Sequence, residues 1–178
     1  MESPRKPGGA RRGQPWVERE DLAVELAAMR EDGRVRRVVL TNGCFDLLHV
    51  GHLRYLEDAS DLGDFLIVAL NTDPSIRAAK GPGRPVVPFE ERAELISALR
   101  CVDRVTRFDE PTLEETLRLF RPDVHAKGSD YTSESVPEAA IDHELGIEIA
   151  ICGGVKEHST TDLLRAARES SSQGPADR

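Results

Sequence analysis

The sequence has few aromatic residues, few cysteines and no long apolar run. Aromatic residues make up 4% of the 178 residues, and three cysteines are present without a C-x-x-C pair. This pattern favours neither a disulfide framework nor a zinc site, and we expect a reducing, cytoplasmic compartment. No apolar stretch approaches the roughly 18 residues that a membrane-spanning helix needs. The basic N-terminus has no apolar segment, so no secretory signal peptide is predicted.

Basic residues are outnumbered by acidic ones. The chain has 24 Lys and Arg against 32 Asp and Glu, a net charge of −8. This balance argues against a surface that binds nucleic acid, although pockets for small anions remain possible. We expect neither a nucleic-acid nor a membrane partner. The length fits one folded domain, which we place at residues 18–169, with a disordered N-terminal tail at 1–17 and a disordered C-terminal tail at 170–178.

Apolar runs and helical patterns alternate along the chain. Five segments are typical of strands, at residues 36–42, 64–71, 102–108, 122–128 and 147–153. The first two are continuous apolar runs, and the last alternates with one more polar face. Apolar residues at helical spacing predict helices at residues 18–31, 51–63, 89–100, 110–120 and 159–170. Continuous apolar strands that alternate with helices indicate an α/β fold. We therefore predict a doubly wound, Rossmann-like parallel sheet of five strands with helices on both faces.

Ligands of such a sheet bind at the carboxyl ends of its strands. Four polar loops follow predicted strands, at residues 41–46, 70–73, 127–130 and 153–160. The first of them lacks the G-x-G-x-x-G pattern of dinucleotide-binding proteins, and the last does not match a Walker loop. The sequence therefore disfavours a dehydrogenase and a P-loop enzyme.

His49 and His52 lie in the segment "TNGCFDLLHVGH", where the first strand gives way to a helix. The amino end of a helix attracts anions, because its backbone amides lack partners within the helix. The two imidazoles could donate hydrogen bonds to a phosphate there. They could instead cap the helix, or bind a metal at i, i+3 spacing, and we favour catalysis.

The segment around the two histidines resembles the H-x-G-H signature of the cytidylyltransferase-like nucleotidyltransferases, and "HSTTDLL" at 158–164 resembles their second signature. The segments "KGPGRPVVPFEERAELISALRCVDRV" and "RPDVHAKGSDY" are similar to the adenylyltransferases of the heptose pathway. Those enzymes join D-glycero-D-manno-heptose 1-phosphate to AMP and are often fused to a sugar kinase. The resemblance spans about residues 18–166 and implies a stand-alone adenylyltransferase that uses ATP with Mg²⁺.

The resemblance implies a set of site residues. His49, His52 and Lys80 would be catalytic, with Lys80 a mobile positive charge in the loop "AAKGPGRP". Arg92 could orient a phosphate, and the hydroxyls at 159–161 would hold the β and γ phosphates. The predicted nucleotide-binding residues are Thr41, Asn42, Gly43, Cys44, Phe45, Asp46, His49, His52, Arg92, Lys127, Gly128, Asp130, Ser159, Thr160 and Thr161.

Several roles stay open at this stage. Asp46 could cap a turn, orient an imidazole or help to hold Mg²⁺. Asp130 could accept a hydrogen bond from a ribose hydroxyl and Lys127 could meet a phosphate, or both could lie in a solvent-facing turn. The roles of Lys156 and His158 are undetermined.

Three other functions fit the same motifs. Glycerol-3-phosphate cytidylyltransferases usually show R-T-x-G-I-S-T before the last helix, where this chain has "GGVKEHSTT". An FMN adenylyltransferase would use the same phosphate machinery with a different acceptor. A nucleotide-binding regulator without catalysis would keep the fold alone. Because relatives are commonly dimeric, we also expect a homodimer.

Overall fold

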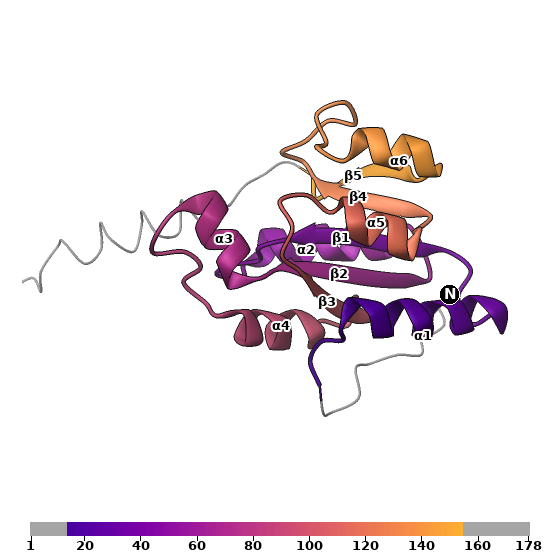
Figure 1. Cartoon of the computed structure of the whole chain (residues 1–178), viewed down its shortest axis with the longest axis horizontal. Helices are drawn as coiled ribbons and strands as arrows, with labels where there is room; N and C mark the ends of the chain where they lie inside the picture. Colours follow the sequence, from indigo (N-terminus) through magenta and orange to yellow (C-terminus); the bar gives the residue numbers. More distant parts are fainter. Residues whose placement is uncertain (1–13, 155–178) are drawn as a thin grey trace, which may run out of the picture.

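The computed structural model describes residues 14–154, which form one parallel β-sheet with helices on both faces (Figure 1). The strands are β1 (Val38–Gly43), β2 (Phe65–Asn71), β3 (Arg104–Phe108), β4 (Val124–Gly128) and β5 (Glu148–Cys152). The helices are α1 (Arg19–Glu31), α2 (Val50–Ser60), α3 (Asp73–Lys80), α4 (Phe89–Ser97), α5 (Glu114–Phe120) and α6 (Ala139–Leu145). The helix predicted at residues 159–170 lies outside the described residues.

The strand order is β3-β2-β1-β4-β5, and every neighbouring pair is parallel. The chain first builds the sheet from β1 towards β3 and then returns to add β4 and β5 beside β1. The strand order therefore reverses between β1 and β4, and such a reversal marks the ligand-binding crevice of open α/β sheets. The predicted fold class is confirmed. No helix within residues 14–154 is long and apolar enough to cross a bilayer.

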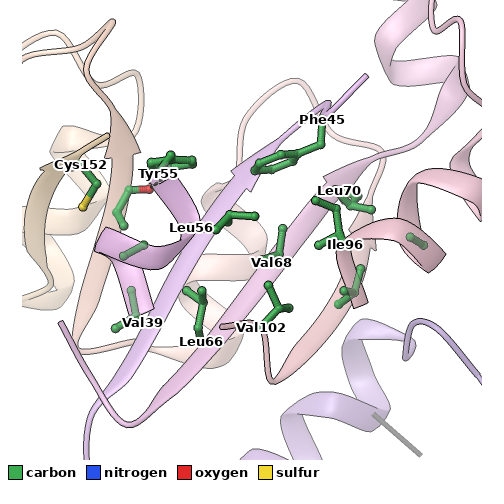
Figure 2. Close-up of a cluster of buried hydrophobic side chains, with 14 of the residues drawn as sticks. Val39, Phe45, Tyr55, Leu56, Leu66, Val68, Leu70, Ile96, Val102 and Cys152 are labelled. Carbon is green, nitrogen blue, oxygen red and sulfur yellow. Dashed lines mark hydrogen bonds between the residues drawn. The ribbon is translucent and has the colours of Figure 1, made fainter. Parts of the chain in front are cut away.

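Two apolar clusters pack on the two faces of the sheet. Val39 and Val68 point to the face covered by α2 and α4, where Figure 2 shows Leu56 and Ile96 packed above the strands. Leu40 and Ile67 point to the opposite face, covered by α1, α5 and α6. Alternate residues of one strand thus enter different clusters. Burial on both faces explains why β1 and β2 are continuous apolar runs in the sequence.

Two helices, α3 and α6, were not predicted from the sequence. They have eight and seven residues, and each places few apolar residues in the core, with Ile76 buried from α3 and Ile141 from α6. A helix of two turns shows too few apolar positions for its period to be recognised, and its stability comes from tertiary packing.

Trp16 and Val17, which were predicted to lie in a disordered N-terminal tail, pack against the domain. The Val17 amide donates to the Val105 carbonyl at 2.9 Å, beside the edge strand β3. The Trp16 indole donates to Glu90 at 2.8 Å, and its ring meets Phe89 edge-on at 5.4 Å. The folded domain therefore begins before residue 18, since these contacts cover part of a sheet edge that would otherwise be unpaired.

Gly63 lies in the turn after α2, packed closely against the start of β1. A Cβ atom at this position would lie 2.5 Å from the Arg37 carbonyl oxygen. It would also lie 2.7 Å from Val39 Cγ2, so either the turn or the strand would have to move. We expect Gly63→Ala to lower the free energy of unfolding by about 1–3 kcal/mol, as overpacking does elsewhere. Urea denaturation monitored by circular dichroism measures this change.

Gly128→Ala is the matched control, because a Cβ atom at Gly128 meets no heavy atom within 4 Å and its φ is not left-handed. This variant should unfold within about 0.5 kcal/mol of the wild type. An equal loss of stability in both variants would show that the close approach at Gly63 is not the cause.

Candidate active site

The carboxyl end of β1 is tied to its surroundings by Tyr55 of α2. The Tyr55 hydroxyl hydrogen-bonds with the Thr41 hydroxyl and donates to the Ala126 carbonyl of β4 at 2.9 Å. Both side chains are buried, and burial raises the pKa of Tyr55. Thr41, which was predicted to bind nucleotide, thus links β1, α2 and β4.

The turn after β1 depends on a tight fit between Gly43 and Phe45. A Cβ atom at Gly43 would lie 2.9 Å from the Phe45 ring, so only glycine allows this approach. The Phe45 backbone is left-handed, with φ at 46°, a conformation that is uncommon outside glycine. The Phe45 ring lies 5.2 Å from that of His52 and 6.3 Å from that of Tyr55. Phe45 is therefore a buried support for His52.

His49 and His52 form a reciprocal cap at the amino end of α2. His49 is the N-cap residue, and its Nδ1 accepts from the Gly51 amide at 3.1 Å. His52 Nδ1 accepts from the His49 amide at 3.4 Å. The two rings stack with their centroids 3.9 Å apart. Capping the helix and binding a phosphate are therefore compatible roles for these two side chains, because the cap uses only Nδ1 of each ring.

This cap determines which nitrogen of each neutral imidazole carries the proton. A ring nitrogen that accepts a hydrogen bond holds a lone pair, so the proton of each neutral ring lies on Nε2. In the neutral form, the donor of each ring is therefore Nε2. Backbone amides of the first turn of α2 add to these donors and favour anions.

Asp46 anchors a second segment to the site. Its carboxylate accepts from the Arg84 guanidinium at 2.7 Å and from the Val86 and Val87 amides at 3.0 Å. Burial by itself raises the pKa of Asp46, but these amides and Arg84 outweigh it and hold the pKa below the ordinary value. Asp46 therefore fastens the segment before α4 to the turn after β1.

The surroundings of Asp46 do not fit a Mg²⁺ ligand. Both of its oxygens already accept hydrogen bonds, and an arginine lies against one of them. Within residues 14–154 there is also no group of three His, Cys, Asp or Glu side chains placed to hold a metal ion. The described residues thus offer no dedicated metal site, and the predicted role of Asp46 in holding Mg²⁺ gains no support.

Arg92 is fully buried, and its guanidinium makes four hydrogen bonds within the protein. Its guanidinium donates to the Cys44 carbonyl at 2.6 Å and to the Asp73 carboxylate at 2.7 Å. It also bonds the carbonyls of Val87 and Asn71 at 3.0 Å. The prediction that Arg92 orients a phosphate is therefore not supported, because the same groups position the loops after β1 and β2. Cys44 contributes its carbonyl, and its thiol lies 3.7 Å from the Asn71 side chain.

Lys80 is the last residue of α3, so it does not lie in a loop as predicted from the sequence. Its side chain is exposed, and α3 ends at Gly81, whose φ of 87° favours glycine. Arg84, four residues further on, joins the same segment to Asp46. This link ties the segment that follows Lys80 to the turn after β1.

A buried polar network lies beside the site on the other face of the sheet. Lys127 of β4 pairs with Glu138 at 3.0 Å and also donates to the Asn42 amide oxygen at 3.0 Å. Burial alone would raise the pKa of Glu138, yet Lys127 and the Leu113 amide hold that pKa below its usual range. Lys127 is almost fully buried, and its ammonium is engaged with Glu138 and Asn42, so its predicted contact with a phosphate stays a prediction.

His125 and Asp142 extend this network and were not predicted as site residues. His125 Nδ1 lies 2.9 Å from an Asp142 oxygen, and His125 Nε2 lies 3.5 Å from the Asn42 oxygen. The spacing of these residues in the sequence could have identified them. His125 and Lys127 are two residues apart in a strand, and Glu138 and Asp142 are four residues apart at a helix. Polar residues at these spacings share one face of a strand and one face of a helix.

Of the remaining predicted residues, two lie within the described part of the chain and the others lie beyond residue 154. Gly128 ends β4 beside the crevice, and Asp130 lies exposed in the loop that follows. Lys156, His158 and the hydroxyl residues Ser159, Thr160 and Thr161 lie outside the described residues, so their predicted roles remain predictions. The structure thus brings together β1, the amino end of α2 and the end of β4.

Asp46→Asn should loosen the anchored segment, because an amide keeps the shape of the carboxylate but loses its charge. We expect the free energy of unfolding at pH 7 to fall by about 1 kcal/mol or more. The stabilisation from a lowered pKa is present above 3.8 and is lost as the pH falls through the lowered value. The difference between variant and wild type should therefore shrink in acid, as thermal unfolding across pH measures.

Asp32→Asn serves as the control, since Asp32 also pairs with an arginine, Arg34, but lies at the surface. Exposed pairs contribute little, so this variant should unfold like the wild type. If Asp32→Asn costs as much as Asp46→Asn, burial and the two backbone amides do not account for the anchor.

The comparisons with known proteins agree with this geometry. The family model described as cytidylyltransferase-like matches residues 40–171. In solved structures, the lipopolysaccharide core biosynthesis protein from Thermoplasma volcanium is 33% identical, with a TM-score of 0.55. That match covers 65% of this chain and 93% of the other.

Several curated relatives carry the name bifunctional protein HldE. The protein from Syntrophotalea carbinolica is 44% identical over 156 residues, which is 88% of this chain and 31% of the relative. The protein from Methylobacillus flagellatus is 48% identical over 146 residues, 82% of this chain and 30% of the relative. The chain thus spans about a third of the length of these relatives. With the family model matched across most of the described sheet and both histidines inside it, the chain belongs to the cytidylyltransferase-like family of nucleotidyltransferases.

Proposed function

We propose that the protein transfers AMP from ATP to a sugar 1-phosphate, with D-glycero-D-manno-heptose 1-phosphate as the acceptor and ADP-heptose and pyrophosphate as products. The observation that carries the proposal is the cap of α2, in which both Nδ1 atoms accept from backbone amides. In the neutral form of each ring, this arrangement puts the N–H on Nε2, at the amino end of α2 and next to the carboxyl end of β1. The resemblance of residues 80–105 and 121–131 to heptose adenylyltransferases supports the choice of acceptor.

The chemistry of the step suits a site without a general base. The second pKa of a phosphate monoester is about 6, so the acceptor is already ionised at neutral pH. An oxygen of its phosphate attacks the α-phosphorus of ATP, and the bond from that phosphorus to the bridging oxygen of pyrophosphate breaks. The electron pair leaves with pyrophosphate, and no proton must be removed. The protein therefore has to align the groups and stabilise negative charge.

The two histidines and the amino end of α2 would provide this stabilisation. Donors in fixed positions need no reorganisation when negative charge grows on the phosphate oxygens. The cap holds both rings in position, and Phe45 supports His52 from the side. Lys80, at the exposed end of α3, would add a positive charge directly before the segment that Asp46 anchors.

Magnesium would enter with the nucleotide in this proposal. Mg²⁺ commonly binds the phosphates of a substrate and keeps several waters, and this arrangement needs no cluster of protein carboxylates. The expected homodimer also remains part of the proposal, because relatives of this type are commonly dimeric.

Purified protein with ATP, Mg²⁺ and a panel of phosphate acceptors should release pyrophosphate most rapidly with the heptose 1-phosphate. The panel includes other sugar 1-phosphates, glycerol 3-phosphate and FMN, each tested with all four nucleoside triphosphates. Product mass distinguishes a nucleoside diphosphate sugar from CDP-glycerol or FAD. Turnover restricted to CTP with glycerol 3-phosphate, or to ATP with FMN, would replace the proposed acceptor. Nucleotide binding without turnover of any acceptor would indicate the regulator.

His49→Ala and His52→Ala should each lower kcat by about a hundredfold or more while changing ATP affinity far less. The physical reason is that each variant removes a donor whose contribution grows in the transition state. Steady-state pyrophosphate release measures kcat, and calorimetric titration measures ATP affinity. Loss of the cap should cost about 1 kcal/mol of stability, so the variants should stay folded.

His143→Ala is the control, since His143 is exposed on α6 and lies outside the cap. It should retain wild-type kcat. Two folded variants at His49 and His52 with normal turnover would end the catalytic assignment. Loss of stoichiometric binding of a transition metal would point to a metal site, and activity that falls only in proportion to stability would point to a packing role.

A further inference from the structure

Asn42 is the second-last residue of β1, so it lies at the carboxyl ends of the strands, where the strand order reverses between β1 and β4. Its side chain lies on the face of the sheet opposite to α2, because Leu40 two residues earlier belongs to the α1, α5 and α6 cluster. Asn42 is only partly buried, whereas the side chains behind it are almost fully buried. Asn42 therefore lies between the buried polar network and the solvent-accessible carboxyl ends of the strands.

The orientation of the Asn42 amide follows from the donor beside it. The Lys127 ammonium lies 3.0 Å from one branch of the amide, and an ammonium can only donate. That branch must therefore be the oxygen, and the NH₂ group is turned the other way. Within residues 14–154 no group accepts a hydrogen bond from this NH₂.

Two buried pairs hold Lys127 and its neighbour in place. Lys127 is paired with Glu138, whose other oxygen accepts from the Leu113 amide at 3.1 Å. His125, two residues earlier on the same strand face, contacts Asp142 one helical turn after Glu138. A lysine without Glu138 could leave the amide oxygen, because its stem has several rotatable bonds. The pairs thus fix the direction of the Asn42 amide.

We propose that Asn42 donates through its NH₂ group to a phosphate oxygen in the β1–β4 crevice, and that Lys127 and Glu138 are positioning residues that aim it. This inference rests on the proposed nucleotidyl transfer. The crevice lies at the reversal of strand order, where a ligand contacts the ends of both strands. The oxygen belongs either to ATP or to the acceptor phosphate, and both present the same acceptor chemistry to an amide.

Asn42→Ala tests the donor directly. We expect kcat/KM for pyrophosphate release to fall by about ten- to a hundredfold, as loss of a fixed donor to a charged oxygen does. A rise in KM for ATP alone assigns the oxygen to the nucleotide, and a rise for the acceptor alone assigns it to the acceptor phosphate. A fall in kcat with both KM values unchanged assigns it to the transition state. Unchanged kcat/KM for both substrates would overturn the proposal.

A double-mutant cycle tests whether the network acts through Asn42. Glu138→Gln keeps an oxygen for the Leu113 amide and removes the charge that holds Lys127. It should lower kcat/KM about tenfold in the wild type and less than about twofold in the Asn42→Ala background, because coupled residues are not additive. The same fold-change in both backgrounds would overturn the positioning role.

Two further variants keep the test decisive. If Glu138→Gln alone does not fold, the Lys127→Met and Glu138→Gln double change removes both charges, and the same non-additivity with Asn42→Ala is expected. Glu144→Gln is the control, since Glu144 lies on α6 but pairs with Arg118 at the surface; it should leave kcat/KM unchanged in both backgrounds. Turnover of no acceptor by the wild type would refute the proposed function, whereas turnover that Asn42→Ala leaves intact would refute only this inference.

Discussion

The pairing of β1 with β4 is the interaction on which the rest of the structure depends. The register places Leu40 beside His125 and Thr41 beside Ala126. The next residue of each strand is therefore Asn42 beside Lys127, at the carboxyl end. From β1 the chain leaves to α2 on one face, and from β4 it leaves to α6 on the other. The two connections separate at this point, which opens the crevice.

Most polar side chains near the crevice are engaged with the protein itself. Arg92 holds the loops after β1 and β2, Asp46 holds the segment before α4, and Lys127 is paired with Glu138. These contacts fix the backbone amides and the few side chains that face the crevice. A site of this kind stabilises charge through donors that are already in place, and it does not depend on side chains that must move.

The sequence predicted β1 and β2 most clearly, because both of their faces are buried and each leaves an apolar run that is easy to recognise. It also predicted α1, α2, α4 and α5 from apolar spacing. The bounds of α1 agree within one residue, whereas α2 and α4 end three residues earlier than predicted and α5 begins four residues later. The short helices α3 and α6 were missed, since Ile76 and Ile141 are too few to show a period. Missing α3 placed Lys80 in a loop, although the helix extends to that residue.

The sequence by itself determined the fold class and the place of His49 and His52, because a strand, a short turn and a helix are local in the chain. Only the tertiary structure decided what Arg92, Asp46 and Lys127 do. Each finds partners far along the chain: Arg92 meets Cys44, Asp46 meets Arg84, and Lys127 meets Asn42. In the sequence, a charged side chain near a motif is equally suited to binding a ligand and to pairing with another residue of the protein. Burial and distance settle the choice, and these exist only once the strands and helices have packed.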